Sequence, residues 1–394
     1  MLSMLIKNKI KLDNLIVDLQ NLLSDKKVEL FKLDKKITLD TDYWIEEDYK
    51  ATQAYLRTYR KNQIPNEINN IKPKGKILII LSYNEPFILS IIPVLNALVV
   101  GNEIILKPSD KNKLFAEIIW QQSGLIKKYN LKLKIISAKK EEIINFIKKV
   151  RAVYFFGSYR VARKIAEICG KNFTEFYPEI ETSDLKVFHE NRRDIKTDVL
   201  LTLKESFIHS GQTCQRIQGI YVHNDFYNEY TQILKEEFVK FSRSRALKNY
   251  IAKNFVAARK NLLNELLFDI KKSKPLEVIR TKSLPILVIN PDKKSDFVRN
   301  AYFLPVLWIS PYSSKEQLVE ILNLRKFFLG LNIQDSSGNF ADYLITNTKF
   351  TRYTINNSHT NVRPKEGWGG SWPSGYSGYV SWVEHFSERY AVIK

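Results

Sequence analysis

The chain has 394 residues, of which 44% are hydrophobic and 26% charged, and its 62 basic and 42 acidic side chains leave a formal net charge of +20. This length and composition exclude a disordered chain and a single small domain, and they predict two or three globular domains with cores of their own. Two cysteines exclude a disulfide framework and suit a reducing compartment, so we expect a cytoplasmic protein.

The positive charge is spread along the whole chain. Its blocks, such as Lys139-Lys140 and Lys271-Lys272, are short, and no nucleic-acid-binding motif accompanies them. Lysines distributed over solvated faces explain the charge, because net charge alone sets solubility and non-specific binding. We therefore expect no nucleic-acid partner. No stretch is apolar over the length of a bilayer, so we also expect no membrane span.

The first half of the chain changes character at Lys76. Before it, to about residue 60, apolar residues recur at helical spacing. After it, strands are predicted at residues 77–81, 103–107, 132–136 and 152–156, and helices at 87–100, 108–129, 141–150 and 160–169. Such alternation predicts a parallel sheet, whose ligands bind at the carboxyl ends of the strands. Three polar segments follow these ends: Tyr83-Asn84, Lys107-Pro108-Ser109 and Gly157-Ser158.

A second α/β region is predicted after Lys171. Its strands are expected at residues 185–188, 217–222, 284–289 and 304–308, and its helices at 194–208, 225–240 and 241–274. Cys214 follows the first of these helices, three residues after Gly211. The thiolate of a cysteine is a strong nucleophile, so Cys214 is a candidate catalytic residue. The alternative is a small buried hydrophobic side chain, as many single cysteines are.

The last part of the chain is rich in glycine. Between residues 357 and 379 lie five of the fourteen glycines: Gly367, Gly369, Gly370, Gly375 and Gly378. Glycine lets a backbone approach another group closely, so this density indicates a loop packed against a ligand or a partner.

Five segments, taken together and in this order, resemble the NAD(P)-dependent aldehyde dehydrogenase superfamily. They are residues 82–87, 93–110, 156–165, 207–214 and 368–378. The fourth fits the family's signature of a phenylalanine, three residues and Gly-Gln-X-Cys. The resemblance runs from about Trp44 to the C-terminus, and the chain is short for this family. It implies an α/β fold with a Rossmann-type cofactor domain, an α/β catalytic domain and a small C-terminal bridging segment.

The resemblance also implies a division of the chain. Residues 1–178 would hold the N-terminal helices and the dinucleotide-binding domain, and residues 179–355 the catalytic thiol domain. Residues 356–394 would form the glycine-rich loop and a bridging or oligomerisation segment. Little room remains between Lys61 and Lys76 for the extended hairpin that usually links subunits, so a homodimer is left open.

The resemblance assigns chemistry to three residues. Cys214 would attack the aldehyde carbon to give a thiohemiacetal, whose oxyanion would be held by the Asn84 amide and the Cys214 backbone N–H. Hydride transfer to NAD(P) would leave a thioester, which a carboxylate-activated water would hydrolyse to the acid. Glu179 is favoured as this base because its register fits the strand at 185–188, and Glu175 is the alternative. Neither is followed by the family's paired glycines.

For the cofactor, the resemblance places Lys107 and Asp110 at the adenosine ribose. An acid facing the ribose 2′-hydroxyl favours NAD over NADP, which remains the alternative because Asp110 is shorter than the usual glutamate. Gly157 and Ser158 would meet the pyrophosphate at a helix N-terminus, where N–H groups and the helix dipole favour anions. No metal is expected.

One departure from the family pattern affects the cofactor site. Ala301 stands where the family has a glutamate that holds the nicotinamide ribose, and Leu304 replaces a glycine. The leading prediction is NAD(P)-dependent oxidation of a small or aliphatic aldehyde to its carboxylic acid. Two alternatives stay open: an acyl-transferring reductase that passes the thioester to another acceptor, and a degenerate, non-catalytic relative.

Overall fold

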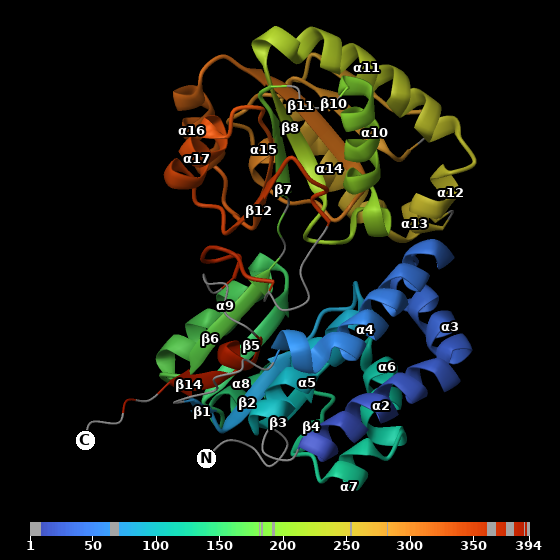
Figure 1. Cartoon of the computed structure of the whole chain (residues 1–394), viewed down its shortest axis with the longest axis vertical. Helices are drawn as coiled ribbons and strands as arrows, with labels where there is room; N and C mark the ends of the chain where they lie inside the picture. The colour runs from blue at the N-terminus through green and yellow to red at the C-terminus, as the bar shows by residue number, and fades with distance from the viewer. Residues whose placement is uncertain are drawn as a thin grey trace.

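The computed structural model describes residues 9–63, 71–180, 182, 184–190, 194–252, 254–281, 283–360, 368–375, 382–389 and 391. They form two lobes, one above the other in Figure 1, and each lobe is built on its own β-sheet. The change from one sheet to the other falls between Ile180 and Asp184. Both lobes are α/β, so the predicted fold class is confirmed.

The lower lobe contains a five-stranded sheet in the order β4-β3-β2-β5-β6, with all neighbours parallel. Its elements are α2 (Lys9–Asp25), α3 (Lys27–Thr38), α4 (Asp42–Gln63), β2 (Lys76–Ile80), α5 (Pro86–Val100), β3 (Glu103–Lys107), α6 (Lys113–Glu117), α7 (Leu125–Tyr129), β4 (Leu133–Ile135), α8 (Lys140–Ile147), β5 (Ala152–Gly157), α9 (Tyr159–Lys171) and β6 (Glu175–Ile180). The helix expected over residues 108–129 is divided by a π-helical turn at Ile118–Gln122 and by Gly124, whose φ is 75°.

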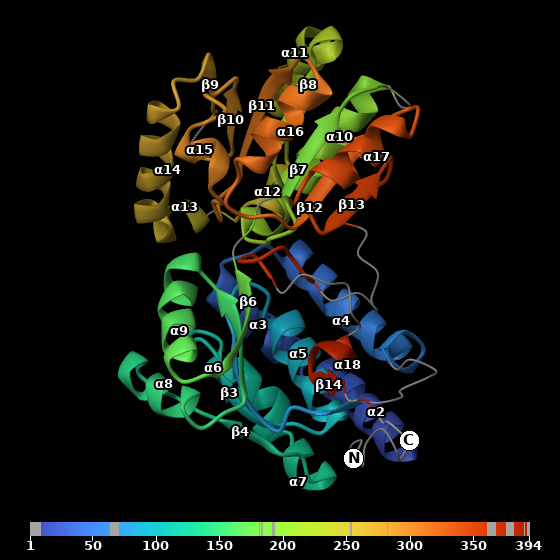
Figure 2. The ribbon, with the colours of Figure 1, turned by 90° about the vertical axis from the view of Figure 1, so that its left-hand side faces the viewer.

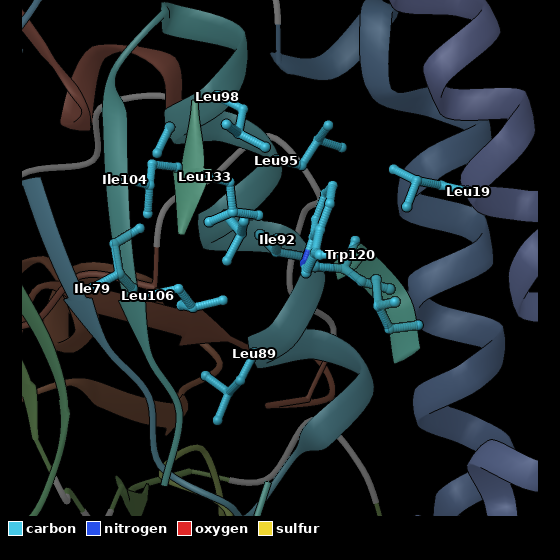
Figure 3. Close-up of a cluster of buried hydrophobic side chains, with 14 of the residues drawn as sticks. Leu19, Ile79, Leu89, Ile92, Leu95, Leu98, Ile104, Leu106, Trp120 and Leu133 are labelled. Carbon is cyan, nitrogen blue, oxygen red and sulfur yellow. The ribbon is translucent and has the colours of Figure 1, made fainter. Parts of the chain in front are cut away.

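Helix α5 is apolar on all sides because it is buried on all sides. Figure 3 shows its side chains Ile92 and Leu95 between the sheet and Trp120, with Leu19 of α2 beyond. The helix ends at Gly101, whose φ of 105° places it in the left-handed region that favours glycine. Helices α8 and α9 cover the opposite face of the sheet (Figure 2). The lower core therefore lies in two layers around β2, β3 and β5.

The upper lobe contains a seven-stranded sheet in the order β13-β12-β7-β8-β11-β10-β9, in which only β9 is antiparallel to its neighbour. Two apolar clusters on opposite faces join it to α10 and α11 on one side and to α14, α15, α16 and α17 on the other (Figure 1). Its elements are β7 (Asp184–Phe188), α10 (Ile195–Ser206), β8 (Ile217–His223), α11 (Asn224–Arg243), α12 (Leu247–Tyr250), α13 (Phe255–Ala258), α14 (Lys260–Lys272), β9 (Glu277–Ile279), β10 (Ile286–Ile289), α15 (Asp296–Arg299), β11 (Val306–Tyr312), α16 (Lys315–Asn323), β12 (Gly330–Gln334), α17 (Asn339–Asn347) and β13 (Arg352–Ile355).

The C-terminal segment returns to the lower lobe. Helix α18 (Trp382–His385) packs on α5, and β14 (Ser387–Arg389) pairs antiparallel with β1 (Ile71–Pro73) in a separate two-stranded sheet. The Tyr154 hydroxyl of β5 donates to the His385 carbonyl oxygen at 2.8 Å. Of the glycines in the predicted loop, Gly367 and Gly378 lie outside the described residues. None of the described helices combines the length and the apolar character needed to cross a membrane.

Candidate active site

A cavity of about 740 Å³ lies where the two lobes meet. The carboxyl ends of β2, β5 and β6 contribute to its wall from the lower lobe, and the turn that carries Cys214 contributes from the upper lobe. Five predicted site residues line it together: Asn84, Gly157, Ser158, Glu179 and Cys214. These residues come from separate parts of the sequence, so the fold itself assembles them.

The turn before Cys214 has an unusual backbone. His209, Ser210 and Gly211 have φ values of 50°, 55° and 82°, all in the left-handed region. A Cβ atom on Gly211 would lie 2.4 Å from the Leu304 carbonyl carbon, so only glycine fits at this position. The Arg216 guanidinium donates to the Gly211 carbonyl oxygen at 3.0 Å. Gly211 therefore does allow a close approach, and the group that approaches it is the backbone of Leu304 and Pro305.

Cys214 faces the cavity from a partly buried position. Burial raises the pKa of its thiol well above the usual value, and the negative charges of Glu85 and Asp184 raise it further, while Arg352 opposes them. The Cys214 carbonyl oxygen accepts a hydrogen bond from the Thr182 hydroxyl at 3.1 Å. The resting side chain is therefore a thiol, and its reaction as a nucleophile requires a proton acceptor.

The Asn84 side chain points at the nucleophile turn. Its amide oxygen accepts a hydrogen bond from the Ser82 hydroxyl at 2.7 Å, and its amide nitrogen donates to the Gln212 carbonyl oxygen at 3.1 Å. These two bonds direct the N–H groups of Asn84 toward the segment that ends in Cys214. The Asn84 amide is therefore held against the backbone of the turn that carries Cys214.

The two glutamates considered as the base have different surroundings. Glu179 lines the cavity near the carboxyl end of β6, and burial raises its pKa to about 8. Glu175 lies at the start of the same strand and forms ion pairs of 2.7 Å with Lys74 and with Arg151. Burial alone would raise the pKa of Glu175, but the hydrogen bond from Lys74 helps to hold it below its usual value. Only Glu179 faces the cavity that holds Cys214.

The predicted phosphate-binding residues sit at the start of a long helix. Gly157 ends β5, and Ser158 precedes the 13-residue helix α9. The Ser158 side chain does not cap this helix, and the N-terminal end of a helix, with its dipole, favours an anion. Arg160, in that turn, also lines the cavity. The residues present fit a dinucleotide: a helix N-terminus and a guanidinium for the phosphates.

Lys107 and Asp110 do not line this cavity. They form an ion pair of 3.5 Å just beyond β3, where Lys107 is 14% exposed and Asp110 is 89% exposed. Because β3 and β5 are both parallel neighbours of β2, their carboxyl ends share one edge of the sheet. An extended dinucleotide with its phosphates at α9 could reach both sites along this edge.

Replacement of Asp110 by asparagine tests which cofactor this edge selects. The carboxylate repels a ribose 2′-phosphate by about 1 kcal/mol at 4 Å in water, so we expect the NADP+ to NAD+ ratio of kcat/KM to rise about fivefold. Steady-state kinetics with both cofactors measures the ratio. Asp292 is exposed and distant from this edge, so Asp292→Asn should leave the ratio unchanged.

Ala301, which replaces the family's ribose-binding glutamate, lines the cavity and packs beside the cluster that contains Phe327. The Gln218 side chain donates to the Asn300 carbonyl oxygen at 2.9 Å and accepts from the Tyr302 N–H at 2.9 Å. The segment around Ala301 is thus held in place although the glutamate is missing.

Sequence reasoning missed a buried charged network behind the nucleophile turn. The His209 ring lies 2.9 Å from Asp40 and 3.3 Å from Asp48, and the Ser210 hydroxyl donates to Asp40 at 3.0 Å. Burial would lower the pKa of His209, but Asp48 and Asp40 raise it well above the usual value, so His209 is an imidazolium. The network ties the start of α4 to the turn. The one sign of this network in the sequence was that a histidine, His209, lies inside the segment 207–214 that matches the family signature.

The two lobes thus join a Rossmann-type sheet, with a candidate dinucleotide site, to a cysteine thiol in one cavity, an arrangement that fits an oxidoreductase. The sequence profile of the aldehyde dehydrogenase family matches residues 40–394, and the chain belongs to this family. The prediction of an oxidoreductase that acts on aldehydes is thereby confirmed.

The relatives are distant in sequence. The dimeric NADP-preferring aldehyde dehydrogenase of Mus musculus is 25% identical over 87% of this chain and 76% of its own length. The NADP+-dependent D-glyceraldehyde dehydrogenase of Thermoplasma acidophilum is 26% identical over 70% of this chain and 56% of its own length. Among solved structures, betaine aldehyde dehydrogenase from Staphylococcus aureus in complex with NAD+ superposes with a TM-score of 0.79 at 16% identity, covering 95% of this chain and 80% of that chain. This likeness supports the fold.

Proposed function

We propose that the protein oxidises an aldehyde to a carboxylic acid with NAD(P), through a thiohemiacetal and a thioester on Cys214. One observation carries the proposal: Cys214, Asn84 and Glu179 line one cavity with the start of α9. The family assignment supports the general reaction, and names of its relatives support NAD(P) as the cofactor class. NAD(P), when bound, supplies the hydride acceptor.

In the first half of the reaction, the thiol of Cys214 gives its proton to solvent water and its sulfur bonds to the aldehyde carbon. The carbonyl oxygen becomes an oxyanion, and the Asn84 amide donates to it in place of the Gln212 carbonyl oxygen. The oxyanion then reforms the carbonyl group as the aldehyde hydrogen departs as hydride. The product on Cys214 is a thioester.

In the second half, water attacks the thioester carbon while Glu179 accepts its proton. The carbon–sulfur bond breaks, the carboxylic acid leaves, and Cys214 returns as a thiol after reprotonation. A carboxylate whose pKa is about 8 is a stronger base than an ordinary glutamate, which suits this step in the fraction of the protein where Glu179 is ionised, a fraction that grows up to and above pH 8. Glu179 in the cavity favours water as the acceptor over the transfer of the acyl group to another molecule.

Replacement of Asn84 by alanine should lower kcat by roughly 100- to 1,000-fold, because one donor to the oxyanion is lost. Steady-state kinetics at saturating cofactor measures this effect. Asn347 is exposed on α17 and donates to the Tyr343 carbonyl oxygen at 2.8 Å, so Asn347→Ala is the matched control and should retain full activity. Equal losses in both variants would remove Asn84 from the mechanism.

The direct test of the proposed function is to incubate the protein with a panel of aldehydes and either NAD+ or NADP+. The absorbance of the reduced cofactor measures turnover. We expect reduction of the cofactor and one carboxylic acid formed per hydride. Turnover only with an acyl acceptor such as coenzyme A would favour the acyl-transferring reductase. No turnover, and no shift in melting temperature with either cofactor, would favour the non-catalytic relative that Ala301 suggests.

Three further expectations remain proposals. The first is the division of the chain at residues 178 and 355, and the second is a cytoplasmic location. The third is a homodimer: residues 64–70, where a linking hairpin would lie, are outside the described residues.

A further inference from the structure

The wall of the cavity nearest the nucleophile turn carries carboxylates that the proposed reaction does not use. Asp48 of α4 and Glu85, which follows Asn84 directly, both line the cavity with Cys214. The chain as a whole carries a net charge of +20, so this local acidity does not follow from its composition. A buried carboxylate without enough counter-charge is costly, so such a group either takes up a proton or binds a cation.

The protein's own cations do not balance these groups. Burial raises the pKa of Glu85 to about 7, Asp48 and Asp40 raise it too, and His209 and a hydrogen bond from Thr213 oppose them. The single imidazolium of His209 is already shared between Asp40 and Asp48. Burial also raises the pKa of Asp48, so the charged forms of Glu85 and Asp48 both lack full compensation, and a cation bound beside them would stabilise their carboxylates.

The other cations on the described wall of the cavity are placed elsewhere. Arg160 belongs to the first turn of α9, beside the predicted phosphate site. Lys326 lies 3.5 Å from Asp296 in an ion pair. The acidic part of the wall, consisting of Asp48 and Glu85, therefore has His209 as its only nearby cation among the described lining residues.

Two tryptophan rings line the same cavity, one of them on the helix that carries Asp48. Trp44 lies one helical turn before Asp48 on α4, so both side chains share one face of the helix. Trp368 lines the cavity as well and packs edge-on against Phe156, with ring centroids 5.8 Å apart. The faces of tryptophan rings attract cations, most strongly where water is excluded. Carboxylates and indole rings together are the chemistry that recognises an ammonium group.

We propose that the aldehyde substrate carries a cationic ammonium group, which Glu85 and Asp48 bind while the aldehyde carbon lies at Cys214. This inference rests on the proposed function, and it names the substrate class as aminoaldehydes. Because Glu85 is adjacent in sequence to Asn84, the ammonium site lies close to the site of the carbonyl oxygen. The substrate is therefore short, with a few carbon atoms between nitrogen and carbonyl.

The kinetic test compares 3-aminopropanal with butanal, which has the same number of heavy atoms and no charge. In the wild-type protein kcat/KM should be roughly 10- to 100-fold higher for the amine, the usual range for a hydrogen-bonded charged group. In Glu85→Gln this ratio should fall close to one, and Asp48→Asn should lower it as well. We compare the ratio of the two kcat/KM values because general damage to the enzyme lowers both values and leaves their ratio unchanged.

The control variant comes from the same helix as Asp48. Glu47 is partly exposed, pairs with Lys50 at 2.9 Å and does not line the cavity, so Glu47→Gln should keep the wild-type ratio. Circular dichroism and thermal melting establish that each variant is folded. A wild-type ratio near one, or a ratio unchanged in both Glu85→Gln and Asp48→Asn, would overturn the ammonium site and leave the dehydrogenase function intact.

A binding experiment separates the two proposals without turnover. n-Butylamine, which is protonated at neutral pH, should bind the wild-type protein in isothermal titration calorimetry, and at least tenfold more weakly to Glu85→Gln. 1-Butanol should bind equally weakly to both. Glu85-dependent binding of the amine without oxidation of any aldehyde would support the site and contradict the proposed function. Equal binding of the amine to both proteins would refute the site.

Discussion

Replacement of Cys214 by alanine is expected to abolish reduction of NAD(P) by any aldehyde, with a fall in kcat of at least about 10,000-fold, as for the loss of other covalent nucleophiles. The reason is that no other described side chain in the cavity is a thiol, since Cys169 belongs to α9 and points into the core of the lower lobe. Without the sulfur neither covalent intermediate forms. Single-turnover measurements with excess enzyme should show no reduced cofactor.

Cys169 provides the matched control. It is buried in α9 against the lower sheet, and burial raises the pKa of its thiol to about 12. Cys169→Ala removes one sulfur from the core, so it should lower the melting temperature slightly and keep full activity. Iodoacetamide should inactivate the wild-type protein and Cys169→Ala alike, faster at higher pH because the thiol of Cys214 has a raised pKa. Activity in Cys214→Ala would eliminate covalent catalysis at this residue.

The alternation of strands and helices could be predicted because buried parallel strands read as apolar runs. Strand β6 was not predicted, since Pro178 and two glutamates interrupt its pattern. It is an edge strand, and an edge tolerates a proline that has no N–H to donate. Strand β12 was missed for a related reason: Asn332 and Gln334 are buried there but bonded to each other at 2.8 Å. Apolar periodicity cannot reveal polar residues whose partners arise from the fold.

In the candidate site, too, some residues could be predicted from the sequence and others could not. Cys214, Asn84 and the residues of the phosphate site could be named because each belongs to a short local motif. The contacts of His209 could not, since Asp40 and Asp48 lie more than 150 residues earlier and only the packing of α4 brings them together. Glu85 was visible in the matched loop, but its importance depends on its burial, which no local pattern gives.

Replacement of Glu179 by glutamine is expected to slow hydrolysis of the thioester by roughly 100- to 10,000-fold, the usual range for loss of a general base. Formation of the thioester should be affected less. The predicted signature is a rapid burst of about one reduced cofactor per active site, followed by slow turnover. Stopped-flow absorbance measures the burst, and mass spectrometry of the quenched protein should find the acyl group on the peptide that contains Cys214.

The pH dependence of thioester hydrolysis tests the role of Glu179 independently. Burial holds the pKa of Glu179 at about 8, so its carboxylate is mostly protonated below that pH and cannot accept a proton from water. The hydrolysis rate should therefore rise with pH up to about 8 and level off above it, whereas the rate in Glu179→Gln should lack this step.

Glu175→Gln distinguishes the base from its neighbour on the same strand. Glu175 is bound to Lys74 and Arg151 outside the cavity, and such partly exposed ion pairs contribute only about 0–1 kcal/mol to stability. The variant should melt at a slightly lower temperature and keep both the wild-type hydrolysis rate and its pH step. If Glu175→Gln showed the burst and Glu179→Gln did not, the base would be Glu175, and the carboxylate would have to leave its ion pairs during the reaction. We expect the opposite result, because Glu179 already lines the cavity that Cys214 faces and needs no such movement.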